Sequence, residues 1–261
     1  MNRMVFYFYA SEDFDKNGAN LIHRKCLEYF SHIFDEIIFG ISLDDISNFH
    51  LRDKVIAWMT GALKCSNVTF KVVQNTEMRE VPFFYNEIAN KLKQLNGFTF
   101  FAHNKGTTND MQKETIQNWI YSMYYFNLNN VDEVATKFHS TLAMLYGTYL
   151  TNADFIQNKY HLHYSGTFFW INAQALAAYL ENHHIELPQP FNRWYAEEFV
   201  GNLFSWENGD MYVSSPGNSL LYGGIRPYTN SEEGIEFMSR DEKDKENYYT
   251  FVKNIKNGRN I

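Results

Sequence analysis

Apolar runs alternate with amphipathic patterns along the first half of the chain. Continuous apolar runs predict four buried strands, namely MVFYFYA, EIIFGIS, VTFKVVQN and GFTFFAH. Between these runs, apolar residues recur at helical spacing and predict helices over residues 21–34, 51–64 and 81–95. Strands that are apolar on both faces and alternate with amphipathic helices are typical of a mostly parallel sheet covered on both sides. The sequence therefore predicts an α/β fold.

The second half has a less regular pattern. Asn109 is a candidate N-cap with Gln112 following, and a second helix is predicted over residues 131–145. HLHYSGTFFWIN is predicted as a strand that leads into a helix from about 173 to 182, and RWYAEEFVGNLF as a further helix. The charged tail from Ser231 carries apolar residues that predict a docked terminal helix, Tyr248, Tyr249, Phe251, Val252 and Ile255. Without repeats or an obvious linker, residues 1–261 are interpreted as one domain.

Composition limits the classes of partner. The net charge is -7 and no basic stripe is visible, which argues against a nucleic-acid partner. No apolar stretch approaches the roughly 20 residues that a membrane span requires, and Cys26 and Cys65 belong to no metal-binding motif. We therefore expect a cytoplasmic protein. Aromatic residues make up 18% of the chain, which fits either an aromatic core or rings that stack on sugars.

The strand GFTFFAH ends in a polar loop that could bind an anion. His103, Asn104, Lys105 and Gly106 stand between this strand and the next predicted helix. Backbone N–H groups of such a loop, together with the positive end of a helix, favour phosphate. Lys105 adds a full charge, and His103 and Asn104 add donors. The alternative is a polar turn in which Lys105 is solvated and Asn104 satisfies the backbone.

Two later segments carry further candidates. Gly166 precedes an apolar strand and could let a ligand approach the backbone, although the rings of Phe168, Phe169 and Trp170 fit a core equally well. The segment RWYAEEF holds Arg193, Glu197 and Glu198. A carboxylate partly desolvated among rings has a raised pKa and suits a general base, whereas the alternative is an ion pair on a helix surface.

Two acidic pairs follow the first two strands. They are Asp13-Phe14-Asp15 and Asp44-Asp45. Mg²⁺ and Mn²⁺ prefer such oxygen ligands, but helix capping or loop solvation explains either pair as well.

Taken in order, these segments resemble bacterial and viral polysaccharide glycosyltransferases, with a distant similarity to the rhamnan-synthesis F type. The matching residues are His103, Lys105 and Gly106 of a His-x-Lys-Gly-like motif, residues 166–170 of a Gly-x-x-Phe-Trp-like strand, and Glu197 in WYAEEF. The segments NLIHRKCLEYFSHIFDEIIFGIS and NTEMREVPFFYNEI are also similar, and the resemblance extends to about residue 205.

The resemblance implies a GT-A-like fold and a glycosyltransferase activity. It implies a nucleotide-sugar-binding half over about 1–110, an acceptor and catalytic half over about 111–230, and a helical tail over 231–261. The expected reaction moves a hexosyl or deoxyhexosyl group from a nucleotide sugar to a hydroxyl of a glycan or lipid-linked glycan. A role in the biosynthesis of a capsule or another surface polysaccharide follows, and a lipid-linked acceptor would draw the enzyme to the membrane surface.

The resemblance also assigns the donor side. Most GT-A enzymes hold a metal on the donor diphosphate with Asp-x-Asp at the place where HNKG stands here. His103, Asn104, Lys105 and Gly106 are therefore expected to bind the diphosphate with no metal ligand and no required cofactor, while use of Mg²⁺ or Mn²⁺ stays open. Tyr9 and Asp44, at the ends of the first two strands, are expected to recognise base and ribose.

On the acceptor side, Glu197 is the expected general base, with Glu198 as the fallback, in an inverting displacement. The residues expected around the acceptor are Tyr164, Ser165, Gly166, Thr167, Trp170 and Arg193. Two alternatives stay open, a non-catalytic nucleotide- or sugar-binding module of the same fold, and a metal-dependent phosphoesterase that uses Asp13 or Asp44.

Overall fold

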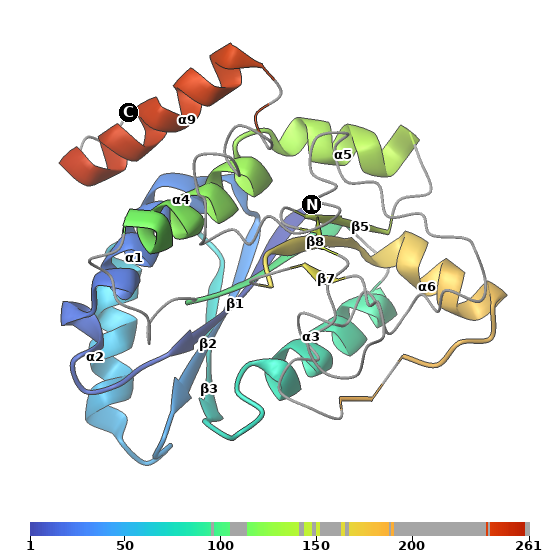
Figure 1. Cartoon of the computed structure of the whole chain (residues 1–261). Coiled ribbons are helices and arrows are strands. Elements are labelled where there is room, and N and C mark those ends of the chain that lie inside the picture. The colour runs from blue at the N-terminus through green and yellow to red at the C-terminus, as the bar shows by residue number, and fades with distance from the viewer. Residues whose placement is uncertain are drawn as a thin grey trace.

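A computed structural model describes residues 1–94, 97–104, 114–140, 144–147, 150–151, 163–164, 167–187, 189–190, 239 and 241–258. The first half of the chain forms parallel strands joined by helices (Figure 1). The strands are β1 (Asn2–Tyr9), β2 (Glu36–Leu43), β3 (Val68–Gln74) and β4 (Phe98–His103), and the helices are α1 (Gly18–Phe30), α2 (Phe49–Thr60) and α3 (Val81–Gln94). Short 3₁₀ helices, η1 (Phe14–Lys16) and η2 (Ser31–Ile33), flank α1. β1 pairs in parallel with β2 and β4, and β2 pairs in parallel with β3.

The second half extends this sheet with two further strands that are joined to it by antiparallel pairing. Its elements are α4 (Glu114–Leu128), α5 (Val131–Ser140), β5 (Leu145–Gly147), β6 (Leu150–Thr151), β7 (His163–Tyr164), β8 (Phe169–Asn172), α6 (Ala173–Asn182) and α9 (Glu242–Asn257). The main sheet has the order β3-β2-β1-β4-β8-β5, in which β8 is antiparallel to both of its neighbours. The predicted α/β fold with a mostly parallel sheet is confirmed.

Two element boundaries differ from the sequence prediction. The helix expected over 131–145 ends at Ser140, and Leu145 begins β5, because its backbone pairs with Ile171 of β8. The strand expected over HLHYSGTFFWIN is divided between two sheets. Thr167 has a φ of 58°, a left-handed conformation that no extended strand can contain, so β8 begins only after it.

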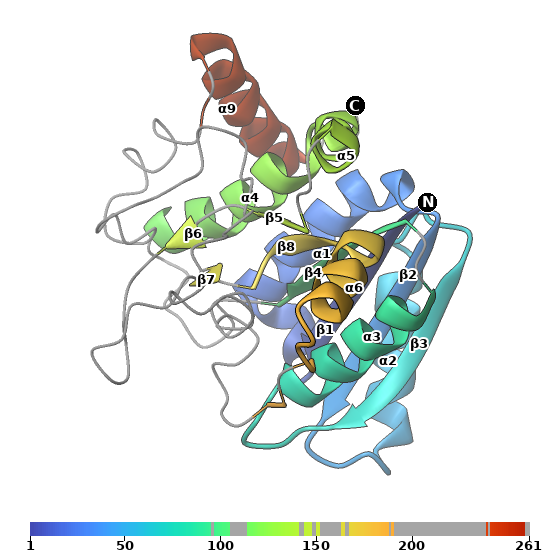
Figure 2. The same cartoon turned by 90° about the vertical axis from the view of Figure 1, so that its right-hand side faces the viewer.

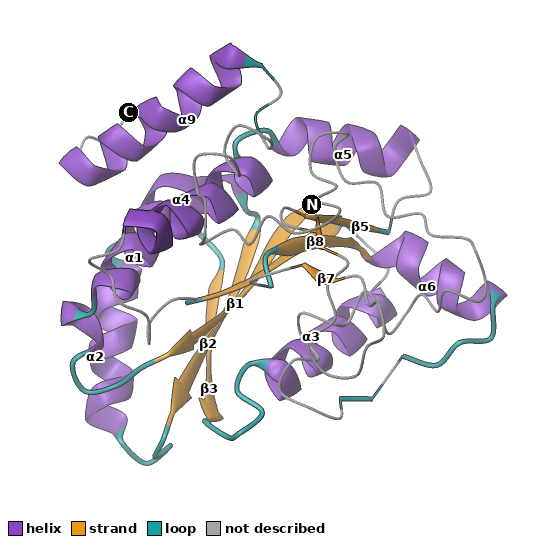
Figure 3. Ribbon diagram, viewed as in Figure 1, coloured by secondary structure: helices purple, strands orange, loops and turns teal. Residues whose placement is uncertain are grey.

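Helices cover both faces of the sheet (Figure 3). Successive β1 side chains alternate between the two faces: Met4, Phe6 and Phe8 pack with α1, α2 and α4, whereas Val5 and Tyr7 pack with α3 and α6. All of these side chains are buried, which explains why β1 is apolar without interruption from Met4 to Phe8.

The terminal helix α9 docks outside α1 and α4 (Figure 2). The Phe251 ring lies 5.2 Å from Tyr29 and 5.3 Å from Phe30, measured between ring centroids. Tyr248, Val252 and Ile255 are also buried, whereas Tyr249 is 44% exposed. The predicted docking of the terminal helix is therefore confirmed, with Tyr249 on its outer side. Across the described ranges, every helix is too short or too polar to cross a bilayer.

Candidate functional site

The strand order defines one edge of the sheet as the place where ligands are expected. From β1 the chain moves to β2 and β3 on one side, and then crosses to β4 on the other side of β1. In open α/β sheets, ligands bind at such a reversal, beyond the carboxyl ends of the strands. The arrowheads of β1, β2 and β3 end at this edge (Figure 1). We call it the carboxyl edge; it carries Tyr9, Asp44, Asn75 and His103 at or just after the strand ends.

Asp44 is held at the carboxyl edge by uncharged donors. The Tyr9 hydroxyl donates to Oδ2 at 2.9 Å, and the Asn75 amide donates to Oδ1 at 2.8 Å. Partial burial raises the pKa of Tyr9, and its hydrogen bond to Asp44 and the charge of that carboxylate raise it further. Tyr9 therefore stays a neutral donor. The Asp44 side chain is exposed, so its carboxylate keeps lone pairs for a ligand that offers hydroxyl groups.

Tyr7 is buried next to Asn75, one of the two residues that hold Asp44. Its hydroxyl donates to Ser42 Oγ at 2.7 Å and lies 3.4 Å from Asn75 Oδ1. Burial raises the pKa of Tyr7 far above its ordinary value, so the phenol stays protonated at every physiological pH. The Tyr7 hydroxyl thus ties β1 and β2 to the segment that follows β3, and fixes the position of Asn75.

Asn104 has a structural role at the end of β4. Its side-chain Oδ1 accepts from the Tyr9 N–H at 3.0 Å, and its Nδ2 donates to the Tyr9 carbonyl and to Asn20 Oδ1, each at 2.9 Å. Both amide hydrogens are used within the protein, so none is left for a phosphate. The expectation that Asn104 binds the donor is corrected on this ground, and the alternative of a backbone-satisfying turn residue holds for this position.

His103 lies at the end of β4 beside a carboxylate that the sequence did not single out. His103 is 8% exposed and Glu80 6% exposed, and the distance from His103 Nδ1 to Glu80 Oε1 is 3.6 Å. This distance suits an ion pair when the imidazole is protonated. The signal for Glu80 was present in the polar stretch NTEMRE directly after the third strand, because strand ends of a parallel sheet share one edge.

Thr167 and Trp170 differ in what they can offer a ligand. Thr167 is fully buried and its backbone is in the left-handed region; among the described residues, its Oγ1 has no hydrogen-bond partner. The next residue, Phe168, has its ring 6.4 Å from that of His103, which places Thr167 near the end of β4. Trp170 is 0% exposed and its indole N–H donates to the Asn127 carbonyl at 3.0 Å. Trp170 is therefore a core residue, and its expected contact with an acceptor is corrected.

The remaining predicted site residues are not described at the level of side chains. Tyr164 lies in β7, with its side chain outside the described part. The others fall outside the described residues altogether: Lys105, Gly106, Ser165, Gly166, Arg193, Glu197 and Glu198.

The acidic pair after β1 does not converge on a common point. Lys16 lies 2.7 Å from Asp13 Oδ1, and Lys54 lies 2.9 Å from Asp15 Oδ1. The hydrogen bond from Lys54 lowers the pKa of Asp15. Within the described ranges, no group of three or more His, Cys, Asp and Glu side chains is arranged to hold a metal ion.

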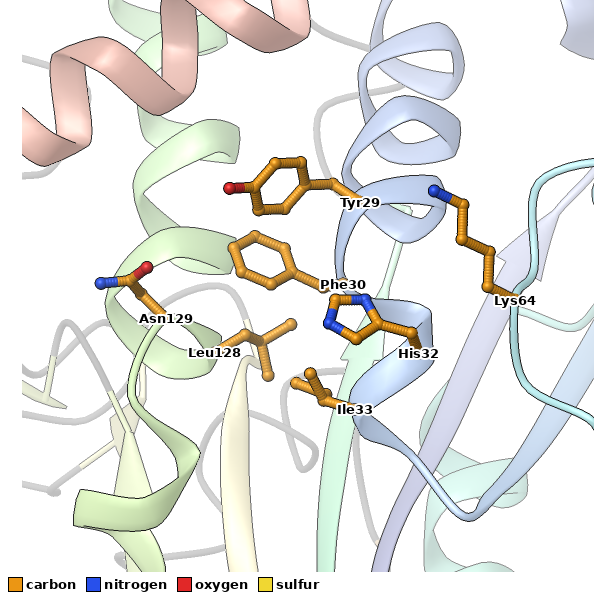
Figure 4. Close-up of a pocket in the computed structure, with 7 residues that line it drawn as sticks. All are labelled: Tyr29, Phe30, His32, Ile33, Lys64, Leu128 and Asn129. Atoms are coloured by element: carbon orange, nitrogen blue, oxygen red, sulfur yellow. The ribbon is translucent and has the colours of Figure 1, made fainter. Parts of the chain in front are cut away.

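A separate hollow lies at the opposite, amino-terminal edge of the sheet (Figure 4). Its volume is about 480 Å³, and it lies where α1 and α4 end and where η2 leads into β2. The lining residues are Tyr29, Phe30, His32, Ile33, Lys64, Leu128 and Asn129. None of the described residues that line this hollow was predicted as a site residue.

Fold and edge together define an α/β protein with polar side chains at the edge where the strand order reverses. The chain matches no protein-family model and no curated protein sequence. Among solved structures it is similar to the apo form of mouse xyloside xylosyltransferase 1, with 10% identity and a TM-score of 0.34 over 77% of this chain and 80% of that chain. At this score the similarity carries no argument about function.

Proposed function

We propose that this protein is a glycosyltransferase that moves a sugar from a nucleotide-sugar donor to a hydroxyl of a glycan or lipid-linked glycan. The observation that carries the proposal is the exposed Asp44 carboxylate, held by Tyr9 and Asn75 beyond the end of β2. In nucleotide-binding α/β folds, an acidic residue at this position accepts the hydroxyl groups of the ribose. The resemblance of the HNKG and WYAEEF segments to polysaccharide glycosyltransferases supplies the reaction class.

In the proposed reaction, the donor diphosphate occupies the end of β4. Charge develops on the diphosphate oxygen as its bond to the anomeric carbon breaks, and His103 and Lys105 offset this charge. Fixed protein donors can stabilise such a leaving group in the way a divalent ion does in other enzymes. We expect Gly106 to let the backbone of the loop approach the phosphates.

The acceptor hydroxyl attacks the anomeric carbon from the opposite side. Glu197, or Glu198 in its place, takes the hydroxyl proton, and the new glycosidic bond forms with inversion. Tyr164, Ser165, Gly166 and Thr167 are proposed to line the acceptor side, and Arg193 to orient the carboxylate or the substrate. Trp170 is left out of this set because its indole N–H is already bonded to the Asn127 carbonyl, whereas the equally buried Thr167 hydroxyl has no partner among the described residues.

The test is release of nucleoside diphosphate from a panel of nucleotide sugars, with and without EDTA. The proposal expects Glu197→Gln to lower turnover by roughly 10² or more, the scale of a positioned base. Lys105→Ala should lower it strongly, while Asp13→Asn, at a residue paired with Lys16, serves as a control and leaves it nearly unchanged.

Two results would contradict the proposal. Binding of nucleotides without release of any nucleoside diphosphate indicates a non-catalytic module. Loss of turnover in Asp13→Asn with little effect of Lys105→Ala, together with inhibition by EDTA, indicates a metal-dependent phosphoesterase.

A further inference from the structure

The segment between β3 and α3 has a strained backbone that directs one carboxylate inward. Arg79 has a φ of 52°, and its N–H donates to the Thr76 carbonyl at 3.0 Å in a tight turn. A residue other than glycine in this region costs about 1–3 kcal/mol, and such residues cluster at functional sites. Arg79 is exposed, whereas the next residue, Glu80, is buried. The turn thus places a carboxylate below the surface at the carboxyl edge.

The charged and titratable groups around this carboxylate come from three parts of the chain. β1 contributes Tyr7, whose pKa is raised mainly by burial and in part by the negative charge of Glu80. The segment before α3 contributes the exposed Arg79, and β4 contributes His103. Tyr7 is neutral and cannot offset the charge of Glu80. Among the described residues, the group within ion-pair distance of Glu80 that can carry a positive charge is His103, when its ring is protonated. A buried carboxylate needs such a partner, because burying an unpaired charge is costly.

We propose that Glu80 is a positioning residue of this site, which holds the His103 ring through Nδ1 and keeps its imidazolium form available to an anionic group of the ligand. The diphosphate of the proposed donor is the anion that fits. The identity of this anion rests on the proposed function, but the coupling between Glu80 and His103 does not.

The coupling makes anion binding depend on pH. A diphosphate binds more tightly when His103 is protonated, so affinity is highest at low pH and falls as pH rises through the titration of His103. The negative charge of Glu80 favours the protonated ring. Removing this charge therefore moves the titration of His103, and the fall in affinity with it, to lower pH.

The experiment compares the full chain with its Glu80→Gln variant. NMR follows the imidazole resonance of His103, assigned with His103→Gln, between pH 5 and pH 9. We expect its midpoint to fall by about one pH unit or more in Glu80→Gln, the usual effect of removing an opposite charge at this distance. Binding of UDP and GDP, measured by calorimetry over the same range, should lose affinity at correspondingly lower pH.

Matched variants separate this role from a structural one. Glu77→Gln makes the same change at an exposed position of the same segment and should leave the His103 midpoint unchanged. Glu80→Asp keeps the charge on a shorter side chain and should restore the midpoint in part. If Glu80→Gln unfolds, Glu80→Asp carries the test, because a lengthened contact should still lower the midpoint.

An identical His103 midpoint in the folded Glu80 variants and the parent chain would overturn the inference. A shifted midpoint, with no nucleoside diphosphate bound at any pH when the other nucleoside diphosphates are tested beside UDP and GDP, would support the role of Glu80 and contradict the proposed function. The two failures are therefore distinguishable.

Discussion

Two carboxylates, one at each end of β2, have partners of opposite kinds at the two edges of the sheet. At the amino-terminal edge, Glu36 lies 2.8 Å from Arg3 Nε and 3.2 Å from Lys91 Nζ, and both cations are buried. At the carboxyl edge, Asp44 follows the other end of the same strand and is held by the neutral Tyr9 and Asn75. Within the described part of the chain, no cation forms an ion pair with Asp44.

This contrast separates a carboxylate that stabilises the fold from one that is available to a ligand. Glu36 lies between two cations that are themselves removed from water, so removing it would take away the carboxylate that both buried charges share. Asp44 is oriented by hydrogen bonds but keeps its full charge and free lone pairs. One strand therefore carries a structural acid at its start and a candidate binding acid just beyond its end.

The largest expected effect is on stability at the amino-terminal edge. Glu36→Gln should lower the free energy of unfolding by about 2–3 kcal/mol, because the buried Arg3 and Lys91 then lose the carboxylate that they share. Urea denaturation measures this change. Nucleotide affinity should stay the same, since Glu36 lies at the far end of the strand. The exposed Asp35→Asn is the control and should cost less than about 1 kcal/mol.

The second prediction concerns Asp44 at the carboxyl edge, where the effect should be on ligand binding and not on stability. Asp44→Asn should weaken nucleotide binding by roughly tenfold to a hundredfold, because hydrogen bonds to a charged group contribute about 1.5–3 kcal/mol. Its free energy of unfolding should change by less than about 0.5 kcal/mol, as is usual for an exposed residue.

Calorimetry with UDP and GDP tests this prediction against Asp45→Asn. The neighbouring Asp45 accepts from the Ser47 N–H and hydroxyl, and its loss should leave affinity unchanged. Equal losses of affinity in the two variants would contradict a specific role of Asp44 in nucleotide binding.

A smaller effect, of opposite sign, is expected at Thr167. Its buried hydroxyl has no partner in the described part of the chain, so Thr167→Val should raise the free energy of unfolding by about 1 kcal/mol. Thr99→Val is a matched control, since the Thr99 hydroxyl in β4 is likewise buried with no partner among those residues. Chemical denaturation should find both variants stabilised, but only Thr167→Val should raise the KM for the acceptor. Unchanged kinetics in Thr167→Val would argue against its proposed place beside the acceptor.

The smallest effect is expected for Tyr9→Phe, which removes one of the two donors that hold Asp44. A single hydrogen bond contributes about 0.5–1.5 kcal/mol, so nucleotide affinity should fall by only about threefold to tenfold. Because the pKa of Tyr9 is raised, its hydrogen bond is fully present below pH of about 10 and is lost as pH rises through the raised value. Affinity in the parent chain, unlike that of Tyr9→Phe, should therefore fall further above this pH.

The regular part of the fold was predictable from local pattern. The four parallel strands and their connecting helices were predicted within a few residues. β1, β2 and β4 are buried along their length and mostly apolar, and the helices carry one apolar stripe, whereas β3 at the sheet edge is only partly buried. α6 was predicted over the residues it occupies, where Asn172 caps it by accepting from the Ala175 N–H. The short β5 was missed, since three residues carry too little periodicity to distinguish a strand from the end of a helix.

The candidate site was only partly predictable. Tyr9, Asp44 and His103 were found because each stands at the end of a predicted strand. Glu80 and Asn75 were not, because their roles depend on His103 and Asp44, which are distant in sequence. Asn104 was assigned to the ligand although its amide is used by Tyr9 and Asn20.

The sequence by itself determined which segments form strands and helices and which polar residues follow the strands, since both depend on near neighbours in the chain. Only the tertiary structure decided which carboxylate meets cations and which meets neutral donors. Arg3 and Lys91 reach Glu36 from β1 and α3, and Tyr9 and Asn75 reach Asp44 from β1 and the end of β3. Electrostatic pairing depends on distance in space, and the order of strands in the sheet sets that distance.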